Sequence, residues 1–136
     1  ILETHMFKFT GKRPANLGVK NGHFTAPTTR KPNWVSSQIA SDDNHYVTPL
    51  AFSGDAGAAM QELKAVIEGM TGTKLIESRA DYLYAEFSTP LMGFTDDVEF
   101  YCDGKRVHVR SSSRLGYSDW NVNRKRVEAI RTALGG

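Results

Sequence analysis

One segment near the carboxyl end gathers side chains that could bind an anion. From Arg110 to Arg126 the sequence is RSSSRLGYSDWNVNRKR, with three serines between two arginines and three consecutive cations at its end. Guanidinium groups and hydroxyls donate strong hydrogen bonds to phosphate or carboxylate oxygens, and the N–H groups at a helix start also attract anions. The segment therefore predicts an anion-binding site made of Ser111, Ser113, Arg114, Arg124 and Arg126.

The three cations 124–126 fall where a helix is expected to begin. Asn123 is the predicted N-cap, with Val122 and Val127 as the hydrophobic pair that often flanks such a cap. Cations are unfavourable in the first helical turn, because the helix dipole is positive there. Either internal acids such as Asp119 compensate for them, or a bound anion does. The sequence leaves both interpretations open.

A hairpin precedes this segment and carries the second group of candidate residues. The Asp-Gly pair at 103–104 is typical of a two-residue turn, which places Glu99 opposite His108 and Asp97 opposite Arg110. Side chains alternate between the two faces of a strand, so these polar residues share one face. The other face is expected to pack on the core and holds Val98, Phe100, Val107 and Val109.

Two interpretations of the polar face stay open. The pairs could form a ladder of ion pairs, each stabilising the sheet by about 0.2–1 kcal/mol. Alternatively, Glu99, His108 and Asp97 could serve an enzyme as acid/base groups or metal ligands. Arg110 already supplies positive charge beside them, which argues against a bound cation. Neither a metal ion nor another cofactor is therefore expected.

The surrounding elements define the expected fold. Apolar residues at helical spacing predict one helix from an N-cap at Asp55 to a stop at Gly72, and another over 124–134. Strands are predicted over 45–52, 74–78, 82–88, 97–102 and 105–112. This order predicts an α+β domain with an antiparallel sheet and both helices on one face. It matches the TATA-binding-protein-like arrangement, with a helix-grip arrangement as the alternative.

The chain divides into three parts. Residues 1–5, ahead of Met6, are interpreted as a cloning remnant and are excluded from the fold argument. Residues 6–41 show no sustained periodicity and predict an extended N-terminal arm, ordered only if it packs on the rest. Residues 42–136 predict a single α+β domain.

Composition excludes several classes of protein. The chain has 136 residues, of which 40% are apolar and 24% charged, as in an ordinary soluble domain. A net charge of +2 is small for a dedicated nucleic-acid-binding protein, so no nucleic-acid partner is expected. Cys102 is the single cysteine, which rules out an internal disulfide. No apolar run is long enough for a transmembrane segment and no signal peptide is visible, so a cytoplasmic location is expected.

Four stretches of the chain resemble one known family. GKRPANLGV, PNWVSSQ, DDVEFY and RSSSRLGYSDWNVNRKRVEAIR are similar to the bacterial and plant family called domain of unknown function 1499. The resemblance implies a complete domain but no activity. Family members often carry cysteines in the arm, where this chain has Ala26 and Trp34. A disulfide or metal role for those two positions therefore cannot operate here.

Three functions follow as hypotheses. The leading one is a small non-enzymatic binding or interaction module, which recognises an anionic small molecule or protein partner through the arginine cluster. The first alternative is an enzyme that uses Glu99 and His108. The second is a structural subunit of an assembly, for which the flat polar face of the sheet and the arm would be contact surfaces. The oligomeric state is not indicated.

Overall fold

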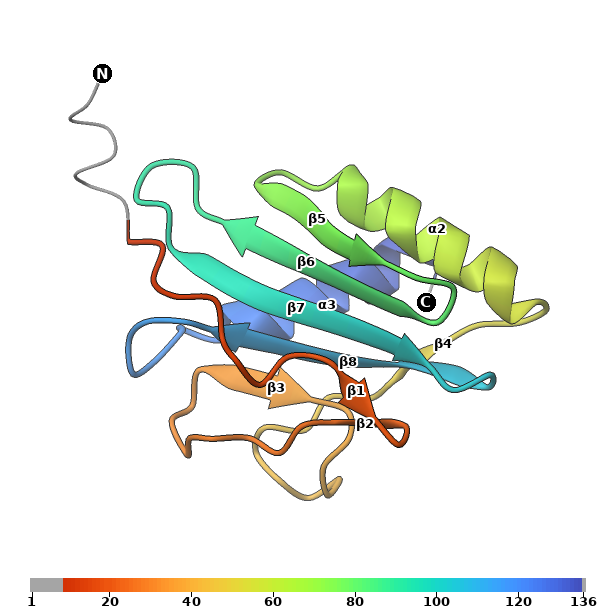
Figure 1. Ribbon diagram of the computed structural model, residues 1–136, viewed down its shortest axis with the longest axis horizontal. Helices are drawn as coiled ribbons and strands as arrows, with labels where there is room; N and C mark the ends of the chain where they lie inside the picture. Colours follow the sequence, from red (N-terminus) through yellow and green to blue (C-terminus); the bar gives the residue numbers. More distant parts are fainter. Residues whose placement is uncertain (1–8, 136) are drawn as a thin grey trace.

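An antiparallel β-sheet forms the centre of the molecule in a computed structural model that describes residues 9–135 (Figure 1). The strand order is β3-β8-β7-β6-β5, and the short strand β4 also pairs with β8. A parallel bridge between Ser36 and Tyr46 is added at one edge. The bounds are Trp34–Ser36 (β3), Leu50–Ala51 (β4), Thr73–Ser78 (β5), Tyr82–Ser88 (β6), Thr95–Cys102 (β7) and Arg106–Ser113 (β8).

Two helices lie on one face of the sheet. Helix α2 spans Ala56–Glu68, and Asp55 caps it as predicted, with its carboxylate accepting a hydrogen bond of 2.8 Å from the Ala58 N–H. The helix ends before the predicted stop at Gly72 because Gly69 forms its C-cap. Helix α3 spans Val122–Ala133, so it begins before the predicted start at residue 124.

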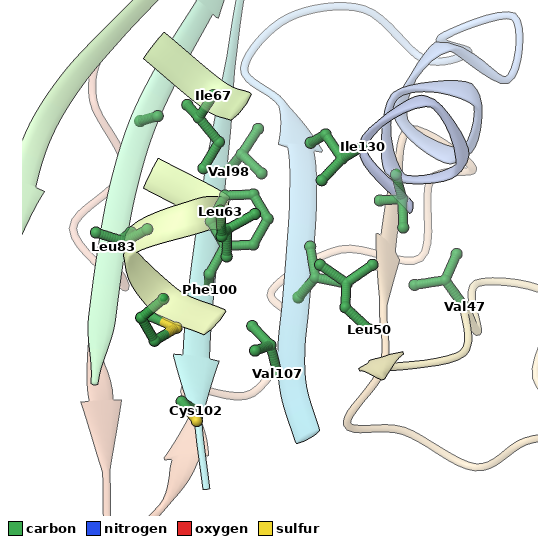
Figure 2. Packing of buried hydrophobic residues seen from close by; sticks show 14 of the residues in the cluster. Val47, Leu50, Leu63, Ile67, Leu83, Val98, Phe100, Cys102, Val107 and Ile130 are labelled. Carbon is green, nitrogen blue, oxygen red and sulfur yellow. The ribbon is translucent and has the colours of Figure 1, made fainter. Parts of the chain in front are cut away.

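The helices and the sheet enclose an apolar core (Figure 2). The predicted core face of the β7–β8 hairpin is confirmed, since its valines and Phe100 are buried against the helices. Burial of a large apolar side chain contributes about 1.5–3 kcal/mol, so this core is the main source of stability. Its most deeply buried members include Leu50, Leu63, Ile67, Leu83, Val98, Phe100, Val109, Val127 and Ile130.

The N-terminal arm crosses the opposite face of the sheet (Figure 1). Within it, β1 (Val19–Lys20) and β2 (His23–Phe24) form a small hairpin. Later in the arm, β3 joins the main sheet as a partner of β8. The predicted first strand over 45–52 is reduced to β4, which begins directly after Pro49 because proline has no N–H for strand pairing. The cloning remnant at 1–5 lies outside the described residues.

The register of the β7–β8 hairpin differs from the prediction by two residues. The observed pairs are Cys102–Val107, Tyr101–His108, Phe100–Val109, Glu99–Arg110, Val98–Ser111 and Asp97–Ser112. The predicted pairs Glu99–His108 and Asp97–Arg110 are therefore wrong. A shift of two residues keeps every side chain on its predicted face, because the side-chain period of a strand is two.

The Asp103 side chain explains why the turn lies one residue later than predicted. Its Oδ1 atom accepts hydrogen bonds of 2.9 Å from the N–H groups of Lys105 and Arg106. This local turn competes with the tight two-residue turn that Asp-Gly usually favours. The Asp103 N–H donates a hydrogen bond of 3.2 Å to the Arg106 carbonyl, so the turn residues are Gly104 and Lys105 rather than Asp103 and Gly104.

The fold class is confirmed at the level of an α+β domain with two helices and a mostly antiparallel sheet. The likeness to the TATA-binding-protein-like arrangement stays a prediction.

Candidate functional site

Charged side chains fill the sheet face beneath the arm, where Glu99 was a candidate acid/base group. Glu99 and Arg110 face each other across β7 and β8, and Oε1 of Glu99 lies 2.9 Å from Nε and 2.5 Å from Nη2 of Arg110. The other carboxylate oxygen accepts hydrogen bonds of 2.6 Å from the Tyr82 hydroxyl and the Gly18 N–H. Arg110 also donates to the Thr25 carbonyl at 2.6 Å. Both oxygens of Glu99 are therefore engaged within the protein.

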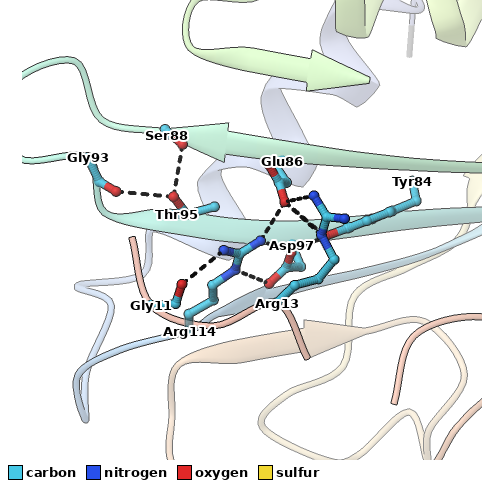
Figure 3. Close-up of polar contacts among 9 residues, drawn as sticks. All are labelled: Gly11, Arg13, Tyr84, Glu86, Ser88, Gly93, Thr95, Asp97 and Arg114. Carbon is cyan, nitrogen blue, oxygen red and sulfur yellow. Dashed lines mark hydrogen bonds and ion pairs between the residues drawn. The ribbon is translucent and has the colours of Figure 1, made fainter. Parts of the chain in front are cut away.

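A second charged group lies further along the same face (Figure 3). Arg114 donates two hydrogen bonds of 2.9 Å to Asp97 and one of 2.6 Å to Glu86. Arg13 of the arm donates to the same Glu86 oxygen at 2.7 Å. The side chains of Arg114 and Asp97 are only 5% and 2% exposed. Arg114, a predicted anion-binding residue, therefore binds two carboxylates of its own chain.

The contacts in this second group shift its ionisation equilibria. Hydrogen bonds to Asp97 and Glu86 raise the pKa of the Arg114 guanidinium above its ordinary value, although burial opposes them. Burial raises the pKa of Glu86, but hydrogen bonds from Arg13 and Arg114 outweigh it and leave that pKa below its ordinary value. Burial raises the pKa of Tyr84, whose hydroxyl donates to Asp97. At neutral pH, Glu86 and Arg114 are therefore charged while the Tyr84 phenol stays protonated.

A cavity of about 340 Å³ lies between this network and the arm. Its charged lining comes from Lys12, Lys31, Asp97, Glu99, Arg110 and Arg114. The last four of these residues are already paired with one another or with the arm. The hydrogen bonds and ion pairs on this face therefore hold the N-terminal arm against the sheet.

The start of α3 is built around Asn123, which is fully buried. Its Oδ1 atom accepts a hydrogen bond of 2.6 Å from Ser111, and its Nδ2 atom donates to Ser113 at 2.9 Å and to Asp119 at 2.7 Å. The predicted N-cap role of Asn123 is wrong, because Asn121 occupies that position with a left-handed φ of 67°. The Asp119 carboxylate accepts from the N–H groups of Asn121 and Asn123 at 2.9 and 3.0 Å. Asp119 thus supplies the negative charge that a helix start favours.

Arg126 is held on the helix side of the sheet. It donates to Asp96 at 2.7 Å, to Asn123 Oδ1 at 2.9 Å and to Ser111 at 3.1 Å. Its guanidinium carbon lies 4.8 Å from the centre of the Phe87 ring. Arg126 and Asp96 remain 12% and 13% exposed, so their pair is shielded from most solvent.

The three predicted anion-binding arginines do not converge on one point. Arg124 donates hydrogen bonds of 2.7 Å to the backbone carbonyls of Tyr46 and Asn44. Arg114 lies beneath the arm, whereas Arg126 lies on the helix side of the sheet. Internal acceptors therefore bind the three arginines, in agreement with the internal alternative that the sequence left open. The geometry offers no support for a shared anion site.

His108 has partners other than Glu99. Its Nδ1 atom lies 3.1 Å from the Ser37 hydroxyl, and its Nε2 atom lies 3.1 Å from the Asp103 carboxylate. Serine, histidine and aspartate in line are the components of a hydrolytic triad. However, the Ser37 oxygen also accepts a hydrogen bond of 2.9 Å from the Val109 N–H, and Ser37 is only 6% exposed. The Ser37 side chain therefore satisfies the backbone of β8 at Val109, and its hydroxyl is not an exposed nucleophile.

A groove of about 570 Å³ opens at one end of the molecule. It lies between the β6–β7 loop (residues 89–94) and the β8–α3 loop (residues 114–121). The charged pair of Arg126 and Asp96 contributes to its lining. Its apolar lining comes from Phe87, Pro90, Phe94, Leu115, Trp120 and Val122.

Sequence reasoning missed this groove because its two walls are loops that strands β7 and β8 separate in the sequence. A signal was present, since both loops carry large apolar residues where loops are usually polar. The β6–β7 loop contains Leu91, Met92 and Phe94, and the β8–α3 loop contains Leu115 and Trp120. The Trp120 residue is 84% exposed.

The described residues contain no cluster typical of a metal site. Within residues 9–135, no group of three or more His, Cys, Asp and Glu side chains could hold a metal ion. Trp34 stacks on His45 with ring centres 3.9 Å apart. The same stretch of chain contains no helix that is both long and apolar enough to span a membrane.

Comparison with known proteins assigns a family but no activity. A family model described as "Protein of unknown function (DUF1499)" matches residues 25–134. A comparison with curated proteins found no match.

Proposed function

We propose that this chain, which belongs to the DUF1499 family, is a non-catalytic binding module for an apolar molecule that carries one anionic group. The walls of the groove between residues 89–94 and 114–121 would hold the apolar part, and Arg126 would receive the carboxylate or phosphate. The observation that carries the proposal is a mostly apolar groove with a largely buried guanidinium in its lining.

The size and lining of the groove support the apolar part of the proposal. Sites for small molecules are typically clefts of about 300–1,000 Å³ with mainly hydrophobic and aromatic walls and a few polar groups. A groove of about 570 Å³ lined by Phe87, Phe94 and Trp120 fits this description. A ligand in it would cover apolar surface that water now contacts, which is favourable at about 25 cal/mol per Å².

Arg126 supports the anionic part of the proposal. It alone among the three arginines predicted from the sequence contributes to the lining of this groove. Charge interactions are stronger where solvent is excluded, and the Arg126 side chain is 12% exposed. Asp96 holds the same guanidinium at 2.7 Å and therefore competes with an incoming anion. The ligand would share Arg126 with Asp96 or displace it.

Titration with decanoate, decanol and decylamine, followed by NMR of the backbone amides, tests the proposal. Decanoate is expected to bind most tightly and to shift signals from residues 89–94 and 114–121. Arg126→Met should weaken decanoate binding about tenfold or more, because a hydrogen bond to a charged group is lost. Asp96→Asn should strengthen it, because the competing carboxylate is removed.

Equal binding of decanoate and decylamine would contradict the anionic part of the proposal. Amide shifts confined to other surfaces would contradict the groove itself. Thermal unfolding of each variant shows whether it is folded at the temperature of the titration. Lys105→Met in the β7–β8 turn is a matched control, since it removes an exposed cation far along the strands from the groove.

The enzyme hypothesis has weaker support than the binding module. Glu99 and His108 have separate partners, and both oxygens of Glu99 are already hydrogen-bonded. The assembly hypothesis can be tested by sedimentation of the purified chain.

A further inference from the structure

The exposed large hydrophobic side chains of the described residues all lie at one end of the molecule. We call this surface the apolar tip, and it surrounds the mouth of the groove. Figure 1 shows both loops and the beginning of the described chain at this end. The apolar tip consists of Phe9, Leu91, Met92, Phe94, Leu115, Tyr117, Trp120 and Val122.

Contacts between the segments make the apolar tip one continuous surface. Phe9 stacks on Phe94 with ring centres 5.2 Å apart, and its N–H donates to the Met92 carbonyl at 2.6 Å. Gly11 lies so close to Leu115 that an added Cβ would be 3.2 Å from that side chain. The arm therefore connects the two loops, which also face each other across the groove.

Two residues project furthest into solvent. Leu91 is 82% exposed and Trp120 is 84% exposed. Trp120 and Asn121 both adopt left-handed backbone conformations, with φ values of 55° and 67°, and this conformation is unfavourable for tryptophan although asparagine tolerates it. The Asp119 carboxylate accepts hydrogen bonds from the N–H groups of Asn121 and Asn123, and these bonds fix this turn. The fold thus maintains a strained turn that presents an indole to solvent.

The charges around the apolar tip favour a negatively charged surface as its partner. Asp119 is the only acidic residue in the two loops, and its carboxylate is engaged by the start of α3. Lys12 and Lys125 are exposed beside the tip, in the arm and in the first turns of α3. The carboxylates of Asp96 and Asp97 nearby are paired with arginines.

From these observations we infer that the apolar tip docks on the surface of an anionic lipid bilayer. Tryptophan and tyrosine side chains concentrate at the membrane–water interface, where one end of the ring system stays wet. Leu91, Met92 and Phe94 would enter the boundary with the acyl chains, and the two lysines would meet anionic headgroups. Exposed side chains on protruding loops can insert into a bilayer without any rearrangement of the core. The inference does not depend on the ligand of the groove.

Flotation with vesicles provides the first test. The whole chain is expected to float with vesicles of phosphatidylcholine and phosphatidylglycerol, and to float much less with phosphatidylcholine alone. Added salt should reduce the floated fraction, because it screens the lysines. Equal flotation with both kinds of vesicle would overturn the role of charge, and no flotation with either would overturn the proposal.

Tryptophan fluorescence locates the contact. Trp34 is 7% exposed and Trp120 is 84% exposed, so a blue shift on adding anionic vesicles reports mainly on Trp120. Lipids brominated on the acyl chain should quench this emission. If the shift instead appears on raising protein concentration without vesicles, the apolar tip is an interface between copies of the chain and the membrane proposal fails.

Substitutions test whether the apolar tip, rather than another part of the surface, binds the vesicles. Leu91→Ser and Trp120→Asn should each weaken vesicle binding about tenfold, because each removes a large apolar group from the boundary. Both side chains are exposed and asparagine tolerates a left-handed φ, so these variants should fold. Lys125→Glu should weaken binding to anionic vesicles, whereas Lys105→Glu and Ala129→Ser, at exposed positions outside the tip, are controls. Vesicle binding that is unchanged in Leu91→Ser and Trp120→Asn would overturn the proposal.

Discussion

Arg110 and Glu99 form a buried ion pair across β8 and β7, and the N-terminal arm closes over it. Their side chains are 8% and 1% exposed. The arm completes their coordination, since the Gly18 N–H donates to Glu99 and the Thr25 carbonyl accepts from Arg110. A buried pair adds little net stability over an apolar pair, but removing one partner leaves an uncompensated charge and is costly. The position of the arm on the sheet therefore depends on both residues.

Glu99→Gln is expected to lower the free energy of unfolding by about 3–5 kcal/mol, because Arg110 then stays buried without a counter-charge. Urea unfolding measures this loss. The arm should also loosen, so trypsin should cleave faster at Lys20 in the variant than in the wild type. Glu77→Gln is the control, since its exposed pair with Arg79 should contribute no more than about 1 kcal/mol. Equal losses in the two variants would contradict the special role of the buried pair.

Glu86→Gln is expected to change how stability depends on pH. The pKa of Glu86 in the folded chain is below its ordinary value of 4.5, because of its hydrogen bonds with Arg13 and Arg114. Its contribution is therefore complete above about pH 4.5 and is lost as pH falls through the lowered folded pKa. The variant should be less stable than the wild type at pH 7 and should lose stability less steeply below pH 4.5.

Urea unfolding at a series of pH values checks this dependence. Glu62→Gln on the exposed side of α2 controls for the removal of one acidic group. If the stability of Glu86→Gln falls with decreasing pH as steeply as that of the wild type, the pH dependence cannot be assigned to Glu86.

Asn123→Asp tests whether Asn123 acts as a buried hydrogen-bonding residue or as a helix N-cap. Aspartate replaces asparagine well at an N-cap. At a fully buried position it would place a second carboxylate beside Asp119 and would lose the hydrogen bonds that Nδ2 donates. We expect the variant to lose about 2 kcal/mol or more in thermal unfolding, because the acceptors of Nδ2 lose their donor and two carboxylates repel each other, an effect that Arg126 offsets only in part. Asn121→Gly, at the observed N-cap with φ 67°, should be neutral or slightly stabilising. Tolerance of aspartate at 123 would restore the predicted cap.

Gly72→Ala should be much more harmful than Gly104→Ala. Both glycines have a positive φ, 78° and 95°, so alanine strains the backbone at each by about 1–2 kcal/mol. At Gly72 the added Cβ would also lie 2.2 Å from the Ser88 carbonyl oxygen, whereas at Gly104 it meets nothing within 4 Å. We expect Gly72→Ala to lower the melting temperature by several degrees more than Gly104→Ala. Similar melting temperatures for the two variants would show that β5 and β6 can separate there at little cost.

Local patterns were sufficient to predict both helices and the four strands β5 to β8, but not the short strands β1 to β3. Alternation along 97–102 placed Val98 and Phe100 on the core face, and helical spacing after Asp55 located α2. These predictions succeeded because side-chain period and capping depend on residues within one element. The family was likewise evident from short stretches of sequence.

Contacts between elements were decided only by the tertiary structure. Alternation fixes the faces of β7 and β8 but not a register shift of two residues, which the Asp103 turn imposes. The same applies to the polar segment near the carboxyl end. The cations and hydroxyls of this segment are evident from the sequence, but their partners are not. Arg126 binds Asp96 and Arg114 binds Asp97 on strand β7, and only the folded sheet, covered on both faces, brings these pairs together.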